Sequence, residues 1–262
     1  MQIGICIPPT ELPTLPTPPD FIDYIEGHVQ QFLLPEREEE AFELHLEALR
    51  AGGKSMPACN SLFPPDLKTS GPAVDEARID AYIATAFRRA HVAGISLVVF
   101  GSGAARLAPP GFATVRAFEQ YVGALRRFAP VAAQYGITIL VEPLQQGECN
   151  VINTIREGAE AVRRADHGSV RLLVDLFHML RNGESPHDIT DLGPLIRHAH
   201  VAENKDRAAP GVHGEDFRPF LRALRAGGYN RRLTIEAVWT DLPRQVQPAV
   251  AELRRQLADA GY

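Results

Sequence analysis

Residues Ile137–Glu148, with the sequence ITILVEPLQQGE, show the pattern from which the fold can be inferred. This stretch begins with five apolar or β-branched residues and then reaches a carboxylate, Glu142. An apolar run this short is typical of a strand that is buried on both faces, as in a parallel sheet. A carboxylate at the end of such a strand is costly to bury unless it is paired or bound to a metal. Glu142 is therefore the first candidate for a functional residue.

Three later apolar runs end in the same way, in a side chain that can bind a metal. In chain order, the residues that end the runs are Glu142, Asp175, His200 and Glu236. They are spaced 33, 25 and 36 residues apart, and each interval is about the length of one strand-helix unit. Because the carboxyl ends of parallel strands meet at one end of a closed barrel, we expect these side chains to lie together.

The length and the order of elements predict one barrel domain. The chain has 262 residues, and about 250 residues is the usual length of a single (β/α)8 barrel. We therefore predict an α/β fold, a (β/α)8 TIM barrel formed by residues 1–262 as one domain. An open doubly wound sheet is disfavoured, because the segment GICIPPTEL after the start of the first strand lacks the G-x-G-x-x-G fingerprint.

The segment after the first strand departs from the usual barrel pattern. Six prolines lie between Pro8 and Pro19, and a helix cannot hold internal prolines at that density. We predict that a Pro-rich segment, residues 8–20, replaces the first helix. Strands are predicted at 2–7, 21–26, within 55–62, at 95–100, from 137, and at 171–176, 196–201 and 232–237. Helices are predicted at 35–53, 74–93, 114–134, 217–226 and 243–260, and at 153–165 with Asn153 as the cap.

Composition limits the partners of the protein. The net charge of −5 gives no basic footprint for nucleic acid, and no apolar run approaches the roughly 20 residues that cross a bilayer. Cys6, Cys59 and Cys149 are far apart and odd in number, which is typical of a reducing cytoplasm. We expect a cytoplasmic protein without nucleic-acid or membrane partners.

Three carboxylates and one imidazole form an oxygen-rich ligand set. Such a set suits Mn²⁺, Mg²⁺ or Co²⁺ with positions open to substrate, and we expect Mn²⁺ with the other two as alternatives. His198 and His200 are two residues apart, so both point to the same side of the sheet. His200 is nearer the strand end and is the expected ligand, with His198 one layer deeper; the reverse assignment stays open. Each acid taken singly could instead cap a helix or pair with an arginine.

The positions of the two glutamates imply a reaction class. The fifth and eighth strands lie roughly 135° apart in a ring of eight, so Glu142 and Glu236 approach a central substrate from different sides. A metal between them would hold a carbonyl and a neighbouring hydroxyl and lower the cost of an enediolate. If one glutamate removes a proton from carbon and the other returns one to the opposite face, the result is epimerisation. Return of the proton to the adjacent carbon is aldose–ketose isomerisation.

Five segments resemble the sugar isomerase/epimerase superfamily of xylose-isomerase-like barrels. They are VVFGSGAAR, VEPLQQGECNVINT, LLVDLFHM, HAHVAENKDRAAPG and LTIEAVW. The resemblance extends from about residue 21 to residue 239 and points to ketose 3-epimerases, such as tagatose 3-epimerase, and to hydroxypyruvate isomerase. It implies one divalent metal on Glu142, Asp175, His200 and Glu236, with the two glutamates as the acid/base pair.

The resemblance also implies three contacts with the substrate. Glu148, six residues after the first glutamate, matches a residue that holds a terminal hydroxyl. His178, three residues after the aspartate, matches a histidine that holds a substrate oxygen. Arg207, ahead of Pro210-Gly211, is the candidate for a further contact, with a loose offset.

The function we expect is a divalent-metal-dependent sugar or sugar-phosphate isomerase or epimerase that works through an enediolate. The alternative is a metal-dependent dehydratase of a keto-polyol, of the inosose or dehydroshikimate type, on the same barrel. An abasic-site DNA endonuclease is disfavoured, because strands two to four end without histidines, and a non-catalytic sugar-binding barrel is disfavoured by the intact ligand set. The expected partner is a small sugar or sugar phosphate, and a homodimer or homotetramer is left open.

Some residues allow two interpretations. The loop Gly101-Ser102-Gly103, with Arg106, could receive an anion such as phosphate, but a lone G-x-G favours a tight strand-to-helix turn. Glu26 fits the family pattern, and a structural role is equally open. His28 is expected to lie on a helix or loop without ligand companions.

Overall fold

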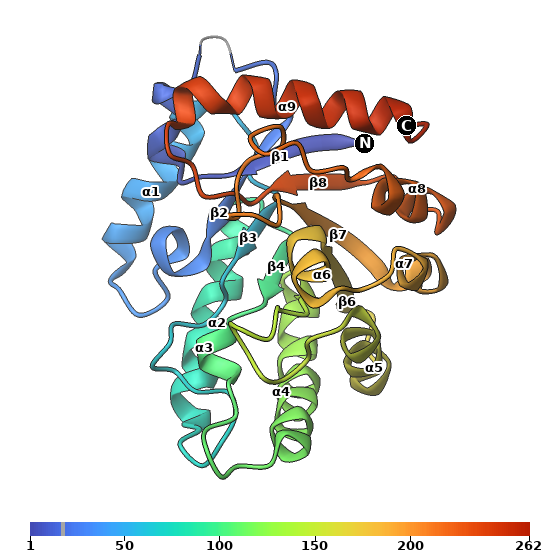
Figure 1. Cartoon of the computed structure of the whole chain (residues 1–262). Coiled ribbons are helices and arrows are strands. Elements are labelled where there is room, and N and C mark those ends of the chain that lie inside the picture. The colour runs from blue at the N-terminus through green and yellow to red at the C-terminus, as the bar shows by residue number, and fades with distance from the viewer. Residues whose placement is uncertain (17–18) are drawn as a thin grey trace.

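The computed structural model describes residues 1–16 and 19–262. Within these residues, eight parallel strands follow one another around a closed barrel, and β8 pairs with β1 (Figure 1). The strands are β1 Gln2–Cys6, β2 Tyr24–His28, β3 Ala58–Asn60, β4 Leu97–Phe100, β5 Thr138–Val141, β6 Val170–Asp175, β7 Ile196–Val201 and β8 Arg232–Ile235. The predicted (β/α)8 TIM barrel is confirmed.

Helices surround this barrel (Figure 1). They are α1 Glu39–Gly52, α2 Glu76–Val92, α3 Gly103–Arg106, α4 Thr114–Gln134, α5 Ile155–Ala165, α6 Leu176–Asn182, α7 His187–Leu192, α8 Arg218–Ala226 and α9 Leu242–Asp259. Short irregular helices also occur, namely the 3-10 helices η1 Pro9–Thr14 and η3 Gly193–Leu195 and the π-helix η2 Val29–Leu33. None of the helices in the described ranges is long and apolar enough to cross a membrane.

The Pro-rich segment takes the place of a helix between β1 and β2, as predicted. Its described part forms η1, and Leu12 from this segment packs against Gly52 at the end of α1, where an added Cβ would lie 2.6 Å from Leu12 Cδ1. Thr17 and Pro18 lie outside the described residues. The prediction for β2 at 21–26 is wrong in its bounds, because a turn occupies residues 20–21 and the strand continues to His28, which pairs with Asn60.

The cap of α5 is Thr154 rather than the predicted Asn153. Thr154 Oγ1 accepts a hydrogen bond from Glu157 N at 3.2 Å, and the Glu157 carboxylate accepts from Thr154 N at 3.1 Å, which is a capping box. Asn153 instead donates to the carbonyls of Leu144 and Cys149, both at 2.8 Å. It therefore holds the loop that follows β5, which borders the candidate site.

Strand alternation places polar side chains in layers inside the barrel. Tyr24 crosses the interior, and its hydroxyl lies 2.8 Å from Thr234 Oγ1. Gly4 leaves room for this ring, because a Cβ at that position would lie 2.2 Å from Tyr24 Cε2. Residues two positions further along β2 and β8 reach the carboxyl end of the barrel, and they are Glu26 and Glu236. Strand register thus directs both glutamates to one layer.

Candidate metal centre

The four predicted metal ligands come together at the carboxyl ends of β5, β6, β7 and β8. Glu142, Asp175, His200 and Glu236 each place one ligand atom within 4.8 Å of the others. His200 Nδ1 lies 3.3 Å from Glu142 Oε1 and 3.4 Å from Glu236 Oε2. We call this group the four-ligand cluster.

The four-ligand cluster contains buried polar atoms that the protein itself leaves unsatisfied. Within the described ranges, Glu142 Oε1, Asp175 Oδ2 and His200 Nδ1 have no hydrogen-bond partner. Such orphaned atoms are rare in folded proteins, because a buried donor or acceptor without a partner is destabilising. A divalent cation among the four side chains would contact all three atoms, so the residues fit a metal site.

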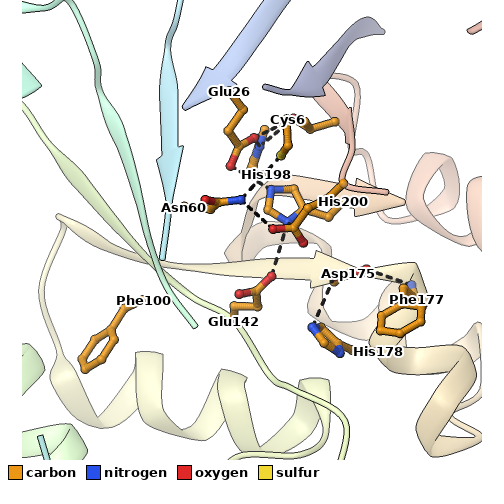
Figure 2. Close-up of polar contacts among 12 residues, drawn as sticks. Cys6, Glu26, Asn60, Phe100, Glu142, Asp175, Phe177, His178, His198 and His200 are labelled. Atoms are coloured by element: carbon orange, nitrogen blue, oxygen red, sulfur yellow. Dashed lines mark hydrogen bonds and ion pairs between the residues drawn. The ribbon is translucent and has the colours of Figure 1, made fainter. Parts of the chain in front are cut away.

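Glu26 orients the histidine of the cluster. Its Oε1 lies 3.0 Å from His200 Nε2, on the side of the ring away from the other ligands. Its Oε2 lies 2.8 Å from His198 Nε2 and accepts from Thr234 Oγ1 at 2.7 Å. Figure 2 shows His200 between Glu26 and Glu142, with His198 deeper in the barrel. A carboxylate on the outer nitrogen of a ligand histidine is a common support for metal binding.

In and around the four-ligand cluster, carboxylates outnumber the cationic side chains. Burial raises the pKa of Glu142, and the nearby Glu236 raises it further. Burial also raises the pKa of Glu236, but Arg207 and His200 outweigh it and bring this pKa to about 2. Burial lowers the pKa of His200, but the adjacent carboxylates of Glu26 and Glu236 raise it well above the ordinary value. Buried negative charge of this kind is stable only when a cation balances it.

The residues expected to contact a substrate lie around the four-ligand cluster. Arg207 donates from Nε to the Glu236 carbonyl at 3.1 Å and from Nη2 to the Glu236 carboxylate, while its Nη1 lies 3.5 Å from Glu148 Oε1. The Arg207 guanidinium also lies over the Phe177 ring, 4.6 Å from its centroid. Glu148 has 37% of its side chain exposed. Arg207 therefore links the exposed rim to Glu236, which is partly buried.

His178 lies on α6, which begins directly after Asp175. Its Nδ1 accepts a hydrogen bond from Gln145 N at 3.1 Å, so the neutral ring carries its proton on Nε2. His178 Nε2 lies 3.4 Å from Asp175 Oδ2. The other oxygen of Asp175 accepts from Phe177 N at 2.8 Å and caps the helix. Asp175 thus combines a capping contact with its place in the four-ligand cluster.

A model of the xylose isomerase-like TIM barrel family matches residues 22–258. The chain belongs to this family. The D-psicose 3-epimerase of Ruminiclostridium cellulolyticum is 31% identical over 120 residues, 45% of this chain and 41% of that protein. The 3-dehydroshikimate dehydratase of Pseudomonas aeruginosa is 33% identical over 125 residues, 43% of this chain and 19% of that protein. The chain thus aligns with less than half the length of either curated relative.

Similarity in three dimensions extends over the whole barrel. The crystal structure of D-psicose 3-epimerase with D-tagatose from Clostridium cellulolyticum H10 superposes with a TM-score of 0.82. The match covers 98% of this chain and 99% of that chain at 21% identity. At this identity the similarity shows a shared fold.

The sequence predictions missed two residues that lie beside the four-ligand cluster. Asn60, the last residue of β3, donates from Nδ2 to Glu236 Oε1 at 2.6 Å. His28 pairs with Asn60 across β2 and β3, and both line a mouth cavity of about 120 Å³ together with Cys6 and Glu26. Burial lowers the pKa of His28. The expectation that His28 lies on a helix or loop is wrong, because His28 is the last residue of β2, two residues beyond Glu26.

The loop that carries Arg207 is held by a buried carboxylate that the sequence predictions also missed. Glu203 is fully buried and accepts hydrogen bonds from the backbone N–H groups of Gly211, His213, Gly214 and Glu215. Arg207 itself has a left-handed backbone, with φ of 49°. The signal available in the sequence was a glutamate two residues beyond the end of the predicted strand 196–201, before a Gly-rich loop.

The Gly101 loop forms a tight turn, the interpretation favoured from the sequence. Arg106 is fully buried, and its Nη1 donates to the carbonyls of Phe100 at 3.2 Å and Glu142 at 2.8 Å. The Arg106 guanidinium thus bonds the end of β4 to the residue after β5. Because these donors are already engaged, the contacts argue against a phosphate ligand. A Cβ on Gly101 would lie 1.9 Å from Glu142 Oε2, so a glycine here makes room for the ligand carboxylate.

Proposed function

We propose that the protein is a divalent-metal-dependent isomerase or epimerase of a sugar or sugar phosphate. The observation that carries the proposal is the convergence of Glu142, Asp175, His200 and Glu236 with orphaned ligand atoms at the catalytic end of a TIM barrel. The matched D-psicose 3-epimerase supports the reaction class. Mn²⁺ is the metal we propose, because carboxylate oxygens dominate the ligand set.

In this proposal the two glutamates move protons. Glu142 and Glu236 extend from β5 and β8, so they face the centre of the barrel from different sides. One removes a proton from the carbon next to the substrate carbonyl, and the other delivers a proton to the opposite face. When bound, the divalent metal supplies Lewis-acid stabilisation of the negative charge that develops on substrate oxygens.

The surrounding residues orient the glutamates and the substrate. Asn60 and Arg207 donate to different oxygens of Glu236, which fixes the plane of its carboxylate. His178, with its proton on Nε2, donates to a substrate oxygen near Asp175. Glu148 accepts from a hydroxyl at the exposed rim, where Arg207 is a second polar contact. Each of these roles requires only donors and acceptors that already face the four-ligand cluster.

A dehydratase acting on a keto-polyol is the second candidate. It is favoured by the match to the 3-dehydroshikimate dehydratase, which is 33% identical over 125 residues. Such a reaction also begins with removal of a proton next to a carbonyl, and a neighbouring hydroxyl then leaves. The same glutamates would serve it.

Product analysis separates the two candidates. The Mn²⁺-loaded protein would be incubated with pooled ketoses, ketose phosphates and 3-dehydroshikimate, and the products followed by NMR. An epimer or an aldose supports the proposal, whereas an unsaturated product formed with loss of water supports the dehydratase. Glu142→Gln should form neither, and Glu184→Gln, whose carboxylate accepts from Ile155 N at the start of α5, should behave as the wild type. A sugar that is bound but never converted would contradict both candidates and indicate a binding protein.

A further inference from the structure

The end of the barrel opposite the four-ligand cluster contains a polar cavity of about 620 Å³. It lies at the N-terminal ends of the strands, and Gln2, Leu97, Thr138 and Arg232, each at the start of its strand, line it. The label N in Figure 1 marks this end of β1. The cavity is therefore separated from the mouth of the barrel by the packed interior.

Arginines gather around this N-terminal cavity. Arg197, Arg231 and Arg232 line it, and Arg171 lies close enough to act on Arg197 through its charge. Among the residues that the structure describes, none of these arginines has a carboxylate oxygen within 4.0 Å. We call these four residues the arginine cluster.

The described residues satisfy only some of the N–H donors of the arginine cluster. Arg171 Nη1 donates to the carbonyls of His167 at 3.3 Å and Val170 at 2.7 Å. Arg232 Nε is buried and, in the described part of the chain, has no hydrogen-bond partner. A buried donor without a partner is uncommon, and Arg232 Nε thus offers a hydrogen bond for which the described residues supply no acceptor.

The arginine cluster concentrates positive charge in a chain that is acidic as a whole. The net charge of the chain is −5, and several arginines elsewhere are paired with carboxylates, as Arg78 is with Glu36 and Asp66. Burial lowers the pKa of Arg197, and the surrounding guanidinium groups lower it further. Like charges held together at the end of a barrel repel one another, and an anion in the cavity would remove that repulsion.

We propose that the N-terminal cavity binds a small phosphate-bearing anion of up to nucleotide size. The planar fork of arginine matches phosphate oxygens two at a time, and several forks around one space suit a multiply charged group. The volume lies within the range of roughly 300–1,000 Å³ that is usual for small-molecule sites, and it exceeds what inorganic phosphate alone would fill. This site is independent of the four-ligand cluster and of the reaction proposed for it.

Calorimetric titration with pyrophosphate, ADP and citrate tests the proposal. The buffers would be freed of divalent cations by a chelating resin, so that a metal cannot hold the phosphates at the carboxylates of the other end. The proposal predicts one pyrophosphate per chain, bound at least tenfold more weakly by Arg197→Gln/Arg231→Gln. The control Arg163→Gln, on the exposed surface of α5, should bind as the wild type does.

The titration also identifies the source of the phosphate. Binding of ADP at least tenfold more tightly than pyrophosphate would indicate a nucleotide, and equal binding would indicate the phosphate groups alone. Citrate bound as tightly as pyrophosphate would overturn the assignment to phosphate. Pyrophosphate binding that is undetectable at millimolar concentration, or unchanged in the double variant, would overturn the site itself.

Thermal unfolding distinguishes loss of the site from loss of the fold. Without added anion, the double variant should unfold at the same temperature as the wild type or higher, because a repulsion has been removed. Pyrophosphate should raise the unfolding temperature of the wild type and leave that of the double variant unchanged. A double variant that unfolds at a lower temperature than the wild type would show that the arginines support the barrel, and would contradict the proposal.

Discussion

His200 Nε2 lies 3.0 Å from Glu26 Oε1, and this contact determines which nitrogen of the ring faces the four-ligand cluster. Because Nε2 is engaged by Glu26, Nδ1 points between Glu142 and Glu236. Glu26 comes from β2 and His200 from β7, so the contact crosses the interior of the barrel. Glu26 therefore acts on the candidate metal site through the histidine, as a positioning residue.

Glu26→Gln should weaken Mn²⁺ binding by about 10- to 100-fold. The amide can donate to His200 Nε2, and the ring would then carry its proton on Nδ1, where a metal requires a lone pair. Calorimetric titration with Mn²⁺ measures the effect, with circular dichroism to verify the fold. Glu184→Gln is the control, since Glu184 is a partly buried glutamate on the loop between α6 and α7. Unchanged Mn²⁺ affinity in Glu26→Gln would show that the contact only packs the barrel.

Gly101→Ala should reduce Mn²⁺ affinity at least tenfold. The added Cβ would lie 1.9 Å from Glu142 Oε2 and would force the carboxylate out of the cluster. Gly123 on α4 is the matched control, because a Cβ added there meets no described atom within 4 Å apart from its chain neighbours and the backbone of its own helix. Gly123→Ala should leave Mn²⁺ binding unchanged and stabilise the fold by about 0.5–1 kcal/mol, as alanine does in a helix interior. Equal Mn²⁺ affinities in the two variants would contradict the role of Gly101.

Glu203→Gln should loosen the loop that positions Arg207. The buried carboxylate accepts from backbone N–H groups including those of Gly211 and Gly214, at 2.7 and 3.1 Å. An amide cannot accept at both oxygen positions, so we expect a loss of at least about 2 kcal/mol in the free energy of unfolding. Hydrogen exchange across residues 203–215 should become faster.

Glu215→Gln is the comparison for this loop. The Glu215 carboxylate accepts from Asn204 N at 3.3 Å, which is a longer and partly exposed contact. Its substitution should change hydrogen exchange far less than that of Glu203. Equal exchange rates in the two variants would mean that the Glu203 carboxylate does not hold the loop.

Glu184 should make the stability of the protein depend on pH. Burial raises its pKa to about 7, whereas an unfolded chain has a glutamate pKa of about 4.3. The folded state thus binds this proton more tightly, and its contribution to stability is present at low pH and lost as the pH rises from about 4.3 through about 7. After allowance for solvent screening, we expect a change of about 1–2 kcal/mol.

Urea denaturation of the wild type and Glu184→Gln at pH 5 and pH 8 measures this dependence. The variant should gain stability relative to the wild type at the higher pH, because glutamine has no proton to lose. If the difference between the two proteins is the same at both pH values, the carboxyl of Glu184 titrates as it does in the unfolded chain.

The four-ligand cluster could be predicted because its members repeat one local pattern. Each of Glu142, Asp175, His200 and Glu236 ends an apolar run, and the barrel brings the ends of such runs together. The intervals between these run ends, each about one strand-helix unit long, also predicted the barrel. Helices α6 and α7 could not be predicted, since seven and six residues are too short to show a helical period.

Asn60 could not be predicted for a different reason. It ends a strand of only three residues, ACN, which has no apolar run to mark it. Its partner Glu236 lies 176 residues away in the sequence. The place of His28 depends on the register between β2 and β3, and that of Glu203 depends on the closure of its loop. A single sequence records neither. Contacts of this kind become visible only when the barrel is closed.

Glu142 and Glu236 are proposed to transfer protons at a carbon next to a carbonyl. The most direct measurement is proton exchange: the Mn²⁺-loaded protein is incubated with pooled ketoses and ketose phosphates in D₂O, and the carbon-bound protons are followed by NMR. The wild type and Glu184→Gln should lose the proton beside the carbonyl, whereas Glu142→Gln and Glu236→Gln, both correctly folded, should show no detectable loss. If either glutamate variant retained more than about one tenth of the exchange rate, a loss of less than roughly 1.4 kcal/mol in transition-state stabilisation, the two-glutamate mechanism would be contradicted.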